Sequence, residues 1–485
     1  MKKKLVPVLL LLLAYSFSYC QPDQSGDYGV GFKYFKTTDP SRKYILGTDT
    51  VDRPMLIHFW YPAKKNSNLQ PMTFKDYIDL IAIREDFNKN QQEINGFSES
   101  FIRAYLGFAK QKFGIDTTVT TKEVFNSRVR AIYKAKPVNG KFPLIIYAPS
   151  NSKSSVQNHI LCEELARRGY FVVSVGSAGA ETLKRKNEIK AALAQVHDME
   201  FIVKFIEDSL KIKYAGVGLL GFSSGGMATV IYQMRHPEVK AMVSLDGSQE
   251  YGLYLILHQF EDFDPAKAVM PYLLLANNYK DFSFYPYYSS IASGNKYLYK
   301  MSYLGHNGFI SYWTQFDRCS KEKHHNAISD SYELVCLAVN AFFDNTVKSD
   351  RLKPKGFEIP NSPLIQQDTV DYSVITGLLN HLLNNGVENA LAEIRSHETL
   401  YQDKRMNLLG KMLIGYNAQM ALKIFAVNLE IHPNSWESYL YLAFLYLRSN
   451  EVDAAKAAIL KAKSLNPANG DVQALYDEIM KVTTK

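Results

Sequence analysis

The sequence predicts an α/β region followed by an all-α region of helical repeats, and three observations support this fold class. Between residues 142 and 303, short apolar runs alternate with amphipathic helical segments. This alternation is typical of a parallel sheet covered by helices on both faces. A Gly-x-Ser-x-Gly stretch follows one of the apolar runs and precedes a helical segment. Beyond residue 400, small and apolar residues recur at a spacing of 34 residues.

Length and composition limit the possible classes of protein. The chain has 485 residues, so two or three domains are expected. With 46% hydrophobic and 21% charged residues, it can build full cores and shows no sign of disorder. The formal net charge is +8, but no basic block lies beyond the extreme N-terminus. We therefore expect no nucleic-acid partner.

Residues 1–20 have the features of a signal peptide. A positive segment at 2–4 precedes an apolar run at 5–14, which is too short to span a bilayer. We expect cleavage before Gln21 and export across the inner membrane, to the periplasm or beyond. A lipoprotein acylated on Cys20 is the less favoured alternative, because Tyr19 is bulky for that processing site. Removal of this segment would lower the formal charge to +5, since it contains three lysines and no acidic residue.

The mature chain would keep Cys162, Cys319 and Cys336. An odd and sparse set of cysteines is not a disulfide framework. Cys319 and Cys336 could form one bridge, or all three could be free thiols, and the sequence leaves both open.

The α/β domain is expected over residues 26–347. Residues 29–63 read as β-structure, and 129–133 resume a strand. Between them, about 72–127 has helical spacing and many aromatic residues, which we interpret as an inserted cap over the active site. Ordinary scaffold helices are the alternative. The core then continues with strands expected at 144–148, 170–175, 241–245, 272–276 and 297–303, and helices at 156–168 and 189–210.

Ser223 is the candidate nucleophile, at the centre of the Gly-x-Ser-x-Gly stretch. A tight strand-turn-helix places the serine in a strained backbone conformation, and Gly221 and Gly225 avoid clashes in that turn. The hydroxyl is then exposed at a helix N-terminus, where backbone N–H groups favour negative charge. Ser224 is a poor rival, because Phe222 occupies the position two residues before it.

Two more candidates follow later strands, at the edge where sites of parallel sheets lie. Asp246 comes directly after the strand at 241–245, and His306 follows the strand at 297–303. A carboxylate can orient a histidine that takes the serine proton. The order Ser223, Asp246, His306 is that of an α/β-hydrolase fold. Asp246 could instead cap a turn, and Asp281, beyond the next strand, is the alternative acid.

The backbone N–H of Ser224 is expected to hold the oxyanion, with a second N–H from the loop after 144–148. The histidines and carboxylates show no ligand spacing for zinc, so no metal and no cofactor are expected.

At this point the sequence resembles the plasma-type platelet-activating-factor acetylhydrolases and their bacterial relatives, within the dienelactone-hydrolase-like group. The resemblance covers residues 28–343. It depends on Arg53-Pro54 leading into 59–63, on the strand at 142–147, on the elbow with its double glycine at 221–226, on Leu245-Asp246, and on His306 shortly before Phe309.

The resemblance implies a secreted serine carboxylic-ester hydrolase acting on short or oxidised acyl esters, such as acetylated phospholipids, with possible peripheral membrane contact. By position, Asn151 would supply the second oxyanion N–H. One departure affects this loop, because Pro149-Ser150 replaces the family's His-Gly pair. A carbohydrate acetyl-esterase or a serine peptidase of the same fold is the alternative. A second alternative is an inactive hydrolase scaffold whose repeats bind a protein.

Residues 348–369 are expected to be a linker, and 370–485 a tetratricopeptide-like repeat domain. Two units are clear, a degenerate third lies at 372–395, and 471–482 would form a capping helix. The domain could offer a concave surface to a peptide or protein partner, or it could buttress the α/β region. The paired positions are Leu408 and Leu442, Met412 and Tyr446, Ala421 and Ala455, Phe425 and Ile459, and Pro433 and Pro467.

Overall fold

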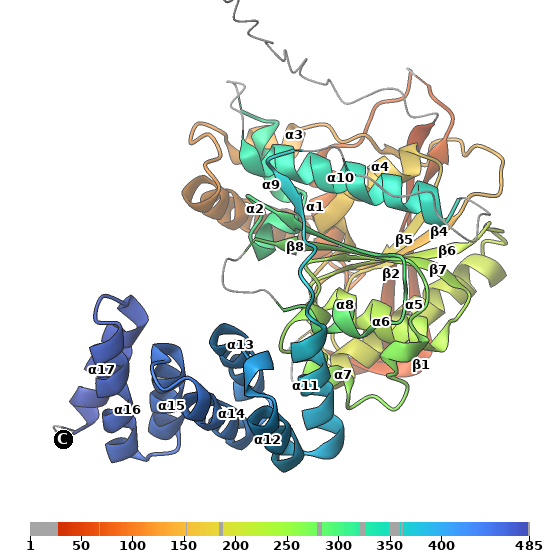
Figure 1. Cartoon of the computed structure of the whole chain (residues 1–485). Coiled ribbons are helices and arrows are strands. Elements are labelled where there is room, and N and C mark those ends of the chain that lie inside the picture. The colour runs from red at the N-terminus through yellow and green to blue at the C-terminus, as the bar shows by residue number, and fades with distance from the viewer. Residues whose placement is uncertain are drawn as a thin grey trace, which may run out of the picture.

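The structure is a computed structural model that describes residues 28–483 except 67, 152, 184–187, 279–283, 321–325, 349–358 and 360–361. The expected signal peptide, Cys20 included, lies outside the described residues. The described chain forms a ten-stranded sheet with helices on both faces, and a row of C-terminal helices that extends away from it (Figure 1). The prediction of an α/β region with a helical region after it is confirmed.

The sheet is mixed, and its strand order is β10-β9-β8-β7-β6-β4-β5-β2-β1-β3. The first strands, β1 (Gly29–Leu46) and β2 (Asp49–Ala63), pair antiparallel, and the short β3 (Ile132–Tyr133) pairs parallel to β1. Gly47 joins β1 to β2 with a φ of 64°, a conformation that glycine adopts without strain.

The centre of the sheet is parallel, as the apolar runs predict. These strands lie between helical layers, so most of their side chains are buried on both faces. Their bounds are β4 (Leu144–Ala148), β5 (Phe171–Val175), β6 (Val217–Phe222), β7 (Val239–Leu245), β8 (Tyr272–Asn277) and β9 (Lys296–Met301).

The far edge of the sheet differs from the prediction. Strand β10 (Ile365–Gln367) pairs antiparallel with β9, although its residues fall within the expected linker. Three residues are too few to carry a recognisable alternation of polar and apolar side chains. The end of the linker is therefore attached to the sheet.

Helices cover the two faces of the sheet (Figure 1). One layer contains α4 (His159–Arg167), α9 (Tyr312–Asp317) and α10 (Ala327–Thr346). The other contains α5 (Glu188–Asp208) and α6 (Gly225–Arg235), with the short helices α7 (Tyr254–Leu257) and α8 (Pro286–Ser290) beside them.

The segment interpreted as a cap forms α1 (Phe74–Ala82), α2 (Gln91–Lys112) and α3 (Thr121–Asn126), between β2 and β3. Helix α2 begins at a capping box, in which Asn90 accepts from the Glu93 N–H and Glu93 accepts from the Asn90 N–H. These helices lie on the α9 side of the sheet (Figure 1).

Most of the C-terminal helices pack on their neighbours in the chain, while the second of them, α12, packs on α11 and α14. The first, α11, contacts α8 of the α/β region, and α17 lies at the far end of the row (Figure 1). Ala390, Ala421 and Ala455 are fully buried, so small residues lie where helices cross closely. The bounds are α11 (Ser373–Asn385), α12 (Val387–Ser396), α13 (Asp403–Ile414), α14 (Ala418–Ile431), α15 (Trp436–Arg448), α16 (Val452–Leu465) and α17 (Gly470–Thr483).

Two further findings concern the described residues. Cys162, Cys319 and Cys336 are free thiols, so the bridge left open by the sequence is not formed. None of the helices in the described ranges combines the length and the apolar character that a membrane span requires.

Candidate active site

Ser223 lies on the sharp turn between β6 and α6, with a φ of 55°. The turn leaves no room for side chains beside the serine. A Cβ on Gly225 would lie 2.1 Å from the carbonyl oxygen of Ala148, and a Cβ on Gly221 would lie 2.8 Å from Cα of Gly226. Both glycines are therefore required by close backbone approach, which explains the Gly-x-Ser-x-Gly pattern.

Neighbouring strand ends hold the strained serine in place. The Ser223 N–H donates to the carbonyl of Leu245 at 3.2 Å, and the Ser223 carbonyl accepts from the Ser248 N–H at 2.8 Å. Both partners belong to the chain around the end of β7, which also carries Asp246. The backbones of the serine and the acid are thus fixed relative to each other.

His306 reaches the serine from the loop after β9. Its Nε2 lies 2.9 Å from Oγ of Ser223, and its ring stacks on Phe222 with centroids 5.3 Å apart. The indole N–H of Trp313 donates to the Asn307 carbonyl at 2.5 Å, which anchors the loop next to the histidine. The side chain of His306 remains 39% exposed, so a substrate can approach it.

Asp246 holds the other nitrogen of His306. Its Oδ2 lies 2.5 Å from Nδ1 of His306, and the carboxylate is fully buried. Tyr251 donates its hydroxyl to Oδ1 at 2.5 Å, and the backbone N–H of Asn277 donates to the same oxygen at 3.0 Å. Burial alone would raise the pKa of Asp246, but the hydrogen bonds and charge of His306, with the bonds from Tyr251 and Asn277, hold this pKa below its usual value.

Tyr251 and Asn277 were not predicted as site residues. Asn277 ends β8, so a polar residue at the carboxyl end of a buried strand was the available signal. Tyr251 lies in a turn after β7, where the sequence shows no comparable pattern. The alternative acid, Asp281, lies outside the described residues, and the structure brings Asp246 to the histidine.

The two expected oxyanion donors, the N–H groups of Ser224 and Asn151, differ in their hydrogen bonding. The N–H of Ser224, at the start of α6, makes no hydrogen bond within the described ranges, so it is available to an oxyanion. The N–H of Asn151 instead donates to Oγ of Ser224 at 2.6 Å. The structure therefore places Asn151 next to the elbow, but with its N–H occupied by the neighbouring hydroxyl. Rotation of the Ser224 side chain would release it.

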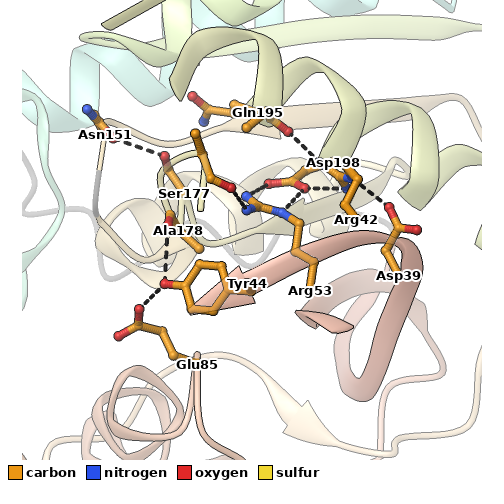
Figure 2. A network of polar contacts seen from close by, with 12 residues as sticks. Asp39, Arg42, Tyr44, Arg53, Glu85, Asn151, Ser177, Ala178, Gln195 and Asp198 are labelled. Atoms are coloured by element: carbon orange, nitrogen blue, oxygen red, sulfur yellow. Dashed lines mark hydrogen bonds and ion pairs between the residues drawn. The ribbon is translucent and has the colours of Figure 1, made fainter. Parts of the chain in front are cut away.

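A buried ionic network supports the loops around the site (Figure 2). Arg53 of β2 forms a bidentate pair with Asp198 of α5, at 2.7 and 2.6 Å, and both side chains are almost fully buried. Arg42 also reaches Asp198, at 2.7 Å, and Asp39 at 2.6 Å. This network fastens the long β1–β2 hairpin to a helix that packs under the sheet.

The same network extends to the loops at the carboxyl ends of β4 and β5. A guanidinium N–H of Arg53 donates to the Ala180 carbonyl at 2.8 Å. Ser177 donates to Oδ1 of Asn151 at 3.4 Å, as Figure 2 shows. Gln195 of α5 donates to the Pro149 carbonyl at 2.8 Å. The loop with Pro149 and Asn151 is therefore held from two sides.

A cleft of 540 Å³ opens beside His306, a volume suited to a small organic ligand. The inserted helices α1 and α2 form one wall, so this insertion borders the candidate site. The other wall comes from the histidine loop and α9. The lining of the cleft includes Arg84, Tyr105, Lys153, Phe222, Tyr312 and Trp313.

The described residues contain no cluster of three or more His, Cys, Asp or Glu side chains that could hold a metal ion. The hydrogen-bonded chain of hydroxyl, imidazole and carboxylate is itself an arrangement that can activate a serine.

Comparisons with known proteins agree with this topology. A protein of Methylorubrum extorquens (strain AM1) with the name "Putative carboxymethylenebutenolidase" is 32% identical over 129 residues, which is 24% of this chain and 44% of that protein. The match thus spans less than half the length of this relative. No model of a known protein family matches the sequence.

Among solved structures, a ferulic acid esterase from Streptomyces cinnamoneus is similar, with a TM-score of 0.50 and 17% identity. The likeness covers 71% of this chain and 97% of the esterase. At this level of sequence identity, the similarity shows only that the two proteins share a fold. The residues 28–347 that the structure describes form an α/β-hydrolase fold, with the elbow turn after β6.

Proposed function

We propose that this protein is a serine carboxylic-ester hydrolase that works through an acyl-enzyme. The observation that carries the proposal is the continuous hydrogen-bonded chain from Ser223 Oγ through His306 to the buried carboxylate of Asp246. Further support comes from the fold shared with a ferulic acid esterase and from the matched carboxymethylenebutenolidase-like segment.

In this mechanism Nε2 of His306 takes the hydroxyl proton as Oγ of Ser223 attacks the ester carbonyl carbon. The resulting imidazolium is stabilised by Asp246, which stays ionised because its pKa is lowered. The tetrahedral intermediate then collapses. The bond to the leaving alcohol breaks, and that alcohol takes the proton from His306. Water attacks the acyl-enzyme by the same route and releases the acid and the free serine.

The oxyanion would be held by the N–H groups of Ser224 and Asn151, each contributing on the order of 3 kcal/mol to transition-state stabilisation. This requires the Ser224 hydroxyl to rotate away from the Asn151 N–H when a substrate binds. The rotation is a single χ1 change of a half-buried serine, so its cost is small compared with the gain of a second donor.

The substrates we propose are esters with a short acyl group, acetylated phospholipids among them, because the elbow at 221–226, Leu245-Asp246 and the loop of His306 resemble the acetylhydrolase family. The volume of the cleft and its aromatic wall suit an ester with an apolar body. We also propose that the protein is exported, on the strength of the signal-peptide pattern at residues 1–20. N-terminal sequencing of the mature protein would test this, with Gln21 as the expected first residue.

The test of the catalytic proposal is turnover of p-nitrophenyl acetate by the full-length mature protein. We expect an initial burst of nitrophenolate and then steady turnover, because acylation releases the alcohol before water attacks. Ser223→Ala should show neither, and its circular dichroism spectrum should match that of the wild type. Absence of both burst and turnover in the wild type would end the proposal.

A second candidate is an inactive hydrolase scaffold whose helical region binds a protein. The occupied N–H of Asn151 is the observation that favours it, because one of the two expected oxyanion donors is already bonded. The same p-nitrophenyl acetate experiment separates the two candidates.

For the helical region we propose tetratricopeptide-type repeats and a concave surface for a peptide or protein partner. The support is the spacing of 34 residues, together with full burial of the paired alanines Ala421 and Ala455 and of Phe425 and Ile459. A screen of a peptide library on the full chain would test this. Binding that is lost on substitution of exposed residues of α13 or α15 is the expected result.

A further inference from the structure

The cleft beside His306 carries two cationic side chains. Arg84 follows α1, and Lys153 lies in the loop after β4. None of the described residues that line the cleft is an aspartate or a glutamate. The guanidinium of Arg84 is half-buried and forms no ion pair within the described part of the chain. An arginine in this situation lacks the counter-charge that usually accompanies it.

The two residues come from distant segments, but both lie next to Gly176. A Cβ built on Gly176, at the end of β5, would lie 3.4 Å from the carbonyl oxygen of Lys153 and 4.0 Å from Cδ of Arg84. Both residues therefore flank the same glycine. The ammonium of Lys153 lies 3.3 Å from the hydroxyl of Tyr105, which orients it along the wall of the cleft.

The acidic residue next to Arg84 in the sequence, Glu85, has another hydrogen-bond partner. Glu85 accepts a hydrogen bond from the hydroxyl of Tyr44. Burial raises the pKa values of the Tyr312 and Tyr44 hydroxyls, and the charge of Arg84 lowers both. Arg84 therefore lies near both tyrosines, and of these Tyr312 lines the cleft.

The wall next to the cations is a ladder of aromatic rings. Phe101 stacks on Tyr105 with centroids 4.4 Å apart, and Tyr105 stacks on Trp313 at 5.9 Å. The ladder continues to Phe97, whose ring lies 5.7 Å from that of Phe101. Such a surface accepts a flat or apolar group, and the cations beside it accept a negative one.

We propose that the substrate is an ester carrying an anionic group, a carboxylate or a phosphate, which Arg84 and Lys153 bind while its apolar body lies on the aromatic ladder. This inference rests on the proposed function, because the reacting ester bond would lie at Ser223. A half-buried guanidinium recognises both anions through paired N–H donors, so the chemistry they share is a compact group of charged oxygens.

The experiment compares three aryl acetates with the full-length mature protein: 4-acetoxybenzoate, 4-acetoxyphenyl phosphate, and the neutral methyl 4-acetoxybenzoate. The readout is the ratio of kcat/KM for each anionic ester to kcat/KM for the neutral ester. We expect at least one ratio to exceed one in the wild type, and to fall as salt is added because charges at a cleft mouth are screened. The anionic ester with the larger ratio shows whether the site prefers a carboxylate or a phosphate.

Variants then assign the effect to the two cations. Arg84→Gln and Lys153→Gln should each lower the elevated ratio about tenfold, the size expected for loss of one charge-assisted contact. Arg103→Gln is the matched control, because Arg103 is on α2 but 73% exposed, pairs with Glu99, and does not line the cleft. This control should leave the ratio unchanged.

The outcomes separate the two proposals. If no ester is hydrolysed, the proposed function fails. If the neutral ester is hydrolysed but neither anionic ester is preferred, or if Arg84→Gln and Arg103→Gln behave alike, the function stands and the anionic-substrate inference is overturned. Thermal unfolding of each variant, with a midpoint like that of the wild type, shows that a lower ratio is not a folding defect.

Discussion

The α/β region and the C-terminal helical region are stabilised by contacts of very different range. In the α/β region, His306 reaches back 83 residues to Ser223 and 60 residues to Asp246. In the helical region, two ion pairs, Arg395 with Glu430 and Lys423 with Glu388, each join residues 35 apart, close to the 34-residue spacing in the sequence. The candidate site therefore depends on the whole sheet, whereas the helices depend on their neighbours.

This difference predicts which substitutions should change stability alone and which should also change activity. A change in the helical region should alter local stability and leave the chemistry untouched. A change in the buried network of the α/β region should alter both, because the same network supports the loops of the site.

The largest effect is expected from Ser223→Ala and His306→Ala. Each removes a reacting group, and turnover of p-nitrophenyl acetate should fall on the order of 10⁴- to 10⁶-fold. The thermal midpoint of His306→Ala should stay close to that of the wild type, because the imidazole is 39% exposed. A large loss of stability in His306→Ala would instead mark the histidine as part of the core.

A smaller but still large effect is expected from Arg53→Met. Among the described residues it leaves the buried carboxylate of Asp198 with only Arg42 as its ion-pair partner, so the free energy of unfolding should fall by about 3 kcal/mol. Activity should fall as well, because Arg53 also holds the loop at Ala180. Urea denaturation measures the free energy of unfolding, and a separate assay without urea measures the activity.

Lys43→Met is the matched control, since its pair with Asp52 is exposed and should contribute less than about 1 kcal/mol. Equal losses in the two variants would show that the buried network does not have the role assigned to it.

Glu250 should make the α/β region sensitive to pH. Burial raises the pKa of this carboxyl to about 7, although bonds from the Tyr288 N–H and the Tyr272 hydroxyl oppose the shift. Because the folded pKa lies above the unfolded one, the native state binds the proton more tightly. Stability should therefore fall by about 2 kcal/mol as the pH rises from 5 to 7.

Chemical denaturation at several pH values, with wild type and Glu250→Gln, checks this. The variant should lose most of the pH dependence over this window. An unchanged slope in Glu250→Gln would assign the effect to other groups.

The smallest effect is expected from Gly410→Ala in α13. A Cβ there would lie 2.5 Å from the ring of Phe425, so the helical region should lose about 1–2 kcal/mol while esterase activity stays the same. Gly377→Ala is the matched control in α11, where the Cβ would meet open space and a helix-favouring residue should add up to about 1 kcal/mol. A loss of activity in Gly410→Ala would contradict the independence of the two regions.

Much of the architecture could be predicted from the sequence because its signals are local. Runs made mostly of apolar residues predicted β4 to β9, and the spacing of 34 residues predicted helical hairpins. The turn glycines Gly221 and Gly225 pointed to Ser223, and loop position pointed to Asp246 and His306. Those three side chains are brought together in the structure, while their catalytic role stays a prediction.

The rest could not be predicted, because it depends on contacts between distant segments. Strand β10 is defined by pairing with β9 rather than by its own three residues. Tyr251 and Asn277 become partners of Asp246 only once the sheet edge is built. The bond from the Asn151 N–H to the Ser224 hydroxyl follows from the close approach of two loops, which a pattern along one loop cannot show.

The most direct test of Ser223 as the nucleophile is covalent labelling of the protein with an alkyl fluorophosphonate, followed by mass spectrometry of the peptides. The account predicts a single adduct on Ser223, no adduct in Ser223→Ala, and much slower labelling in His306→Ala. An intact protein that takes no label, or that takes it on Ser224 while Ser223 stays free, would contradict the account.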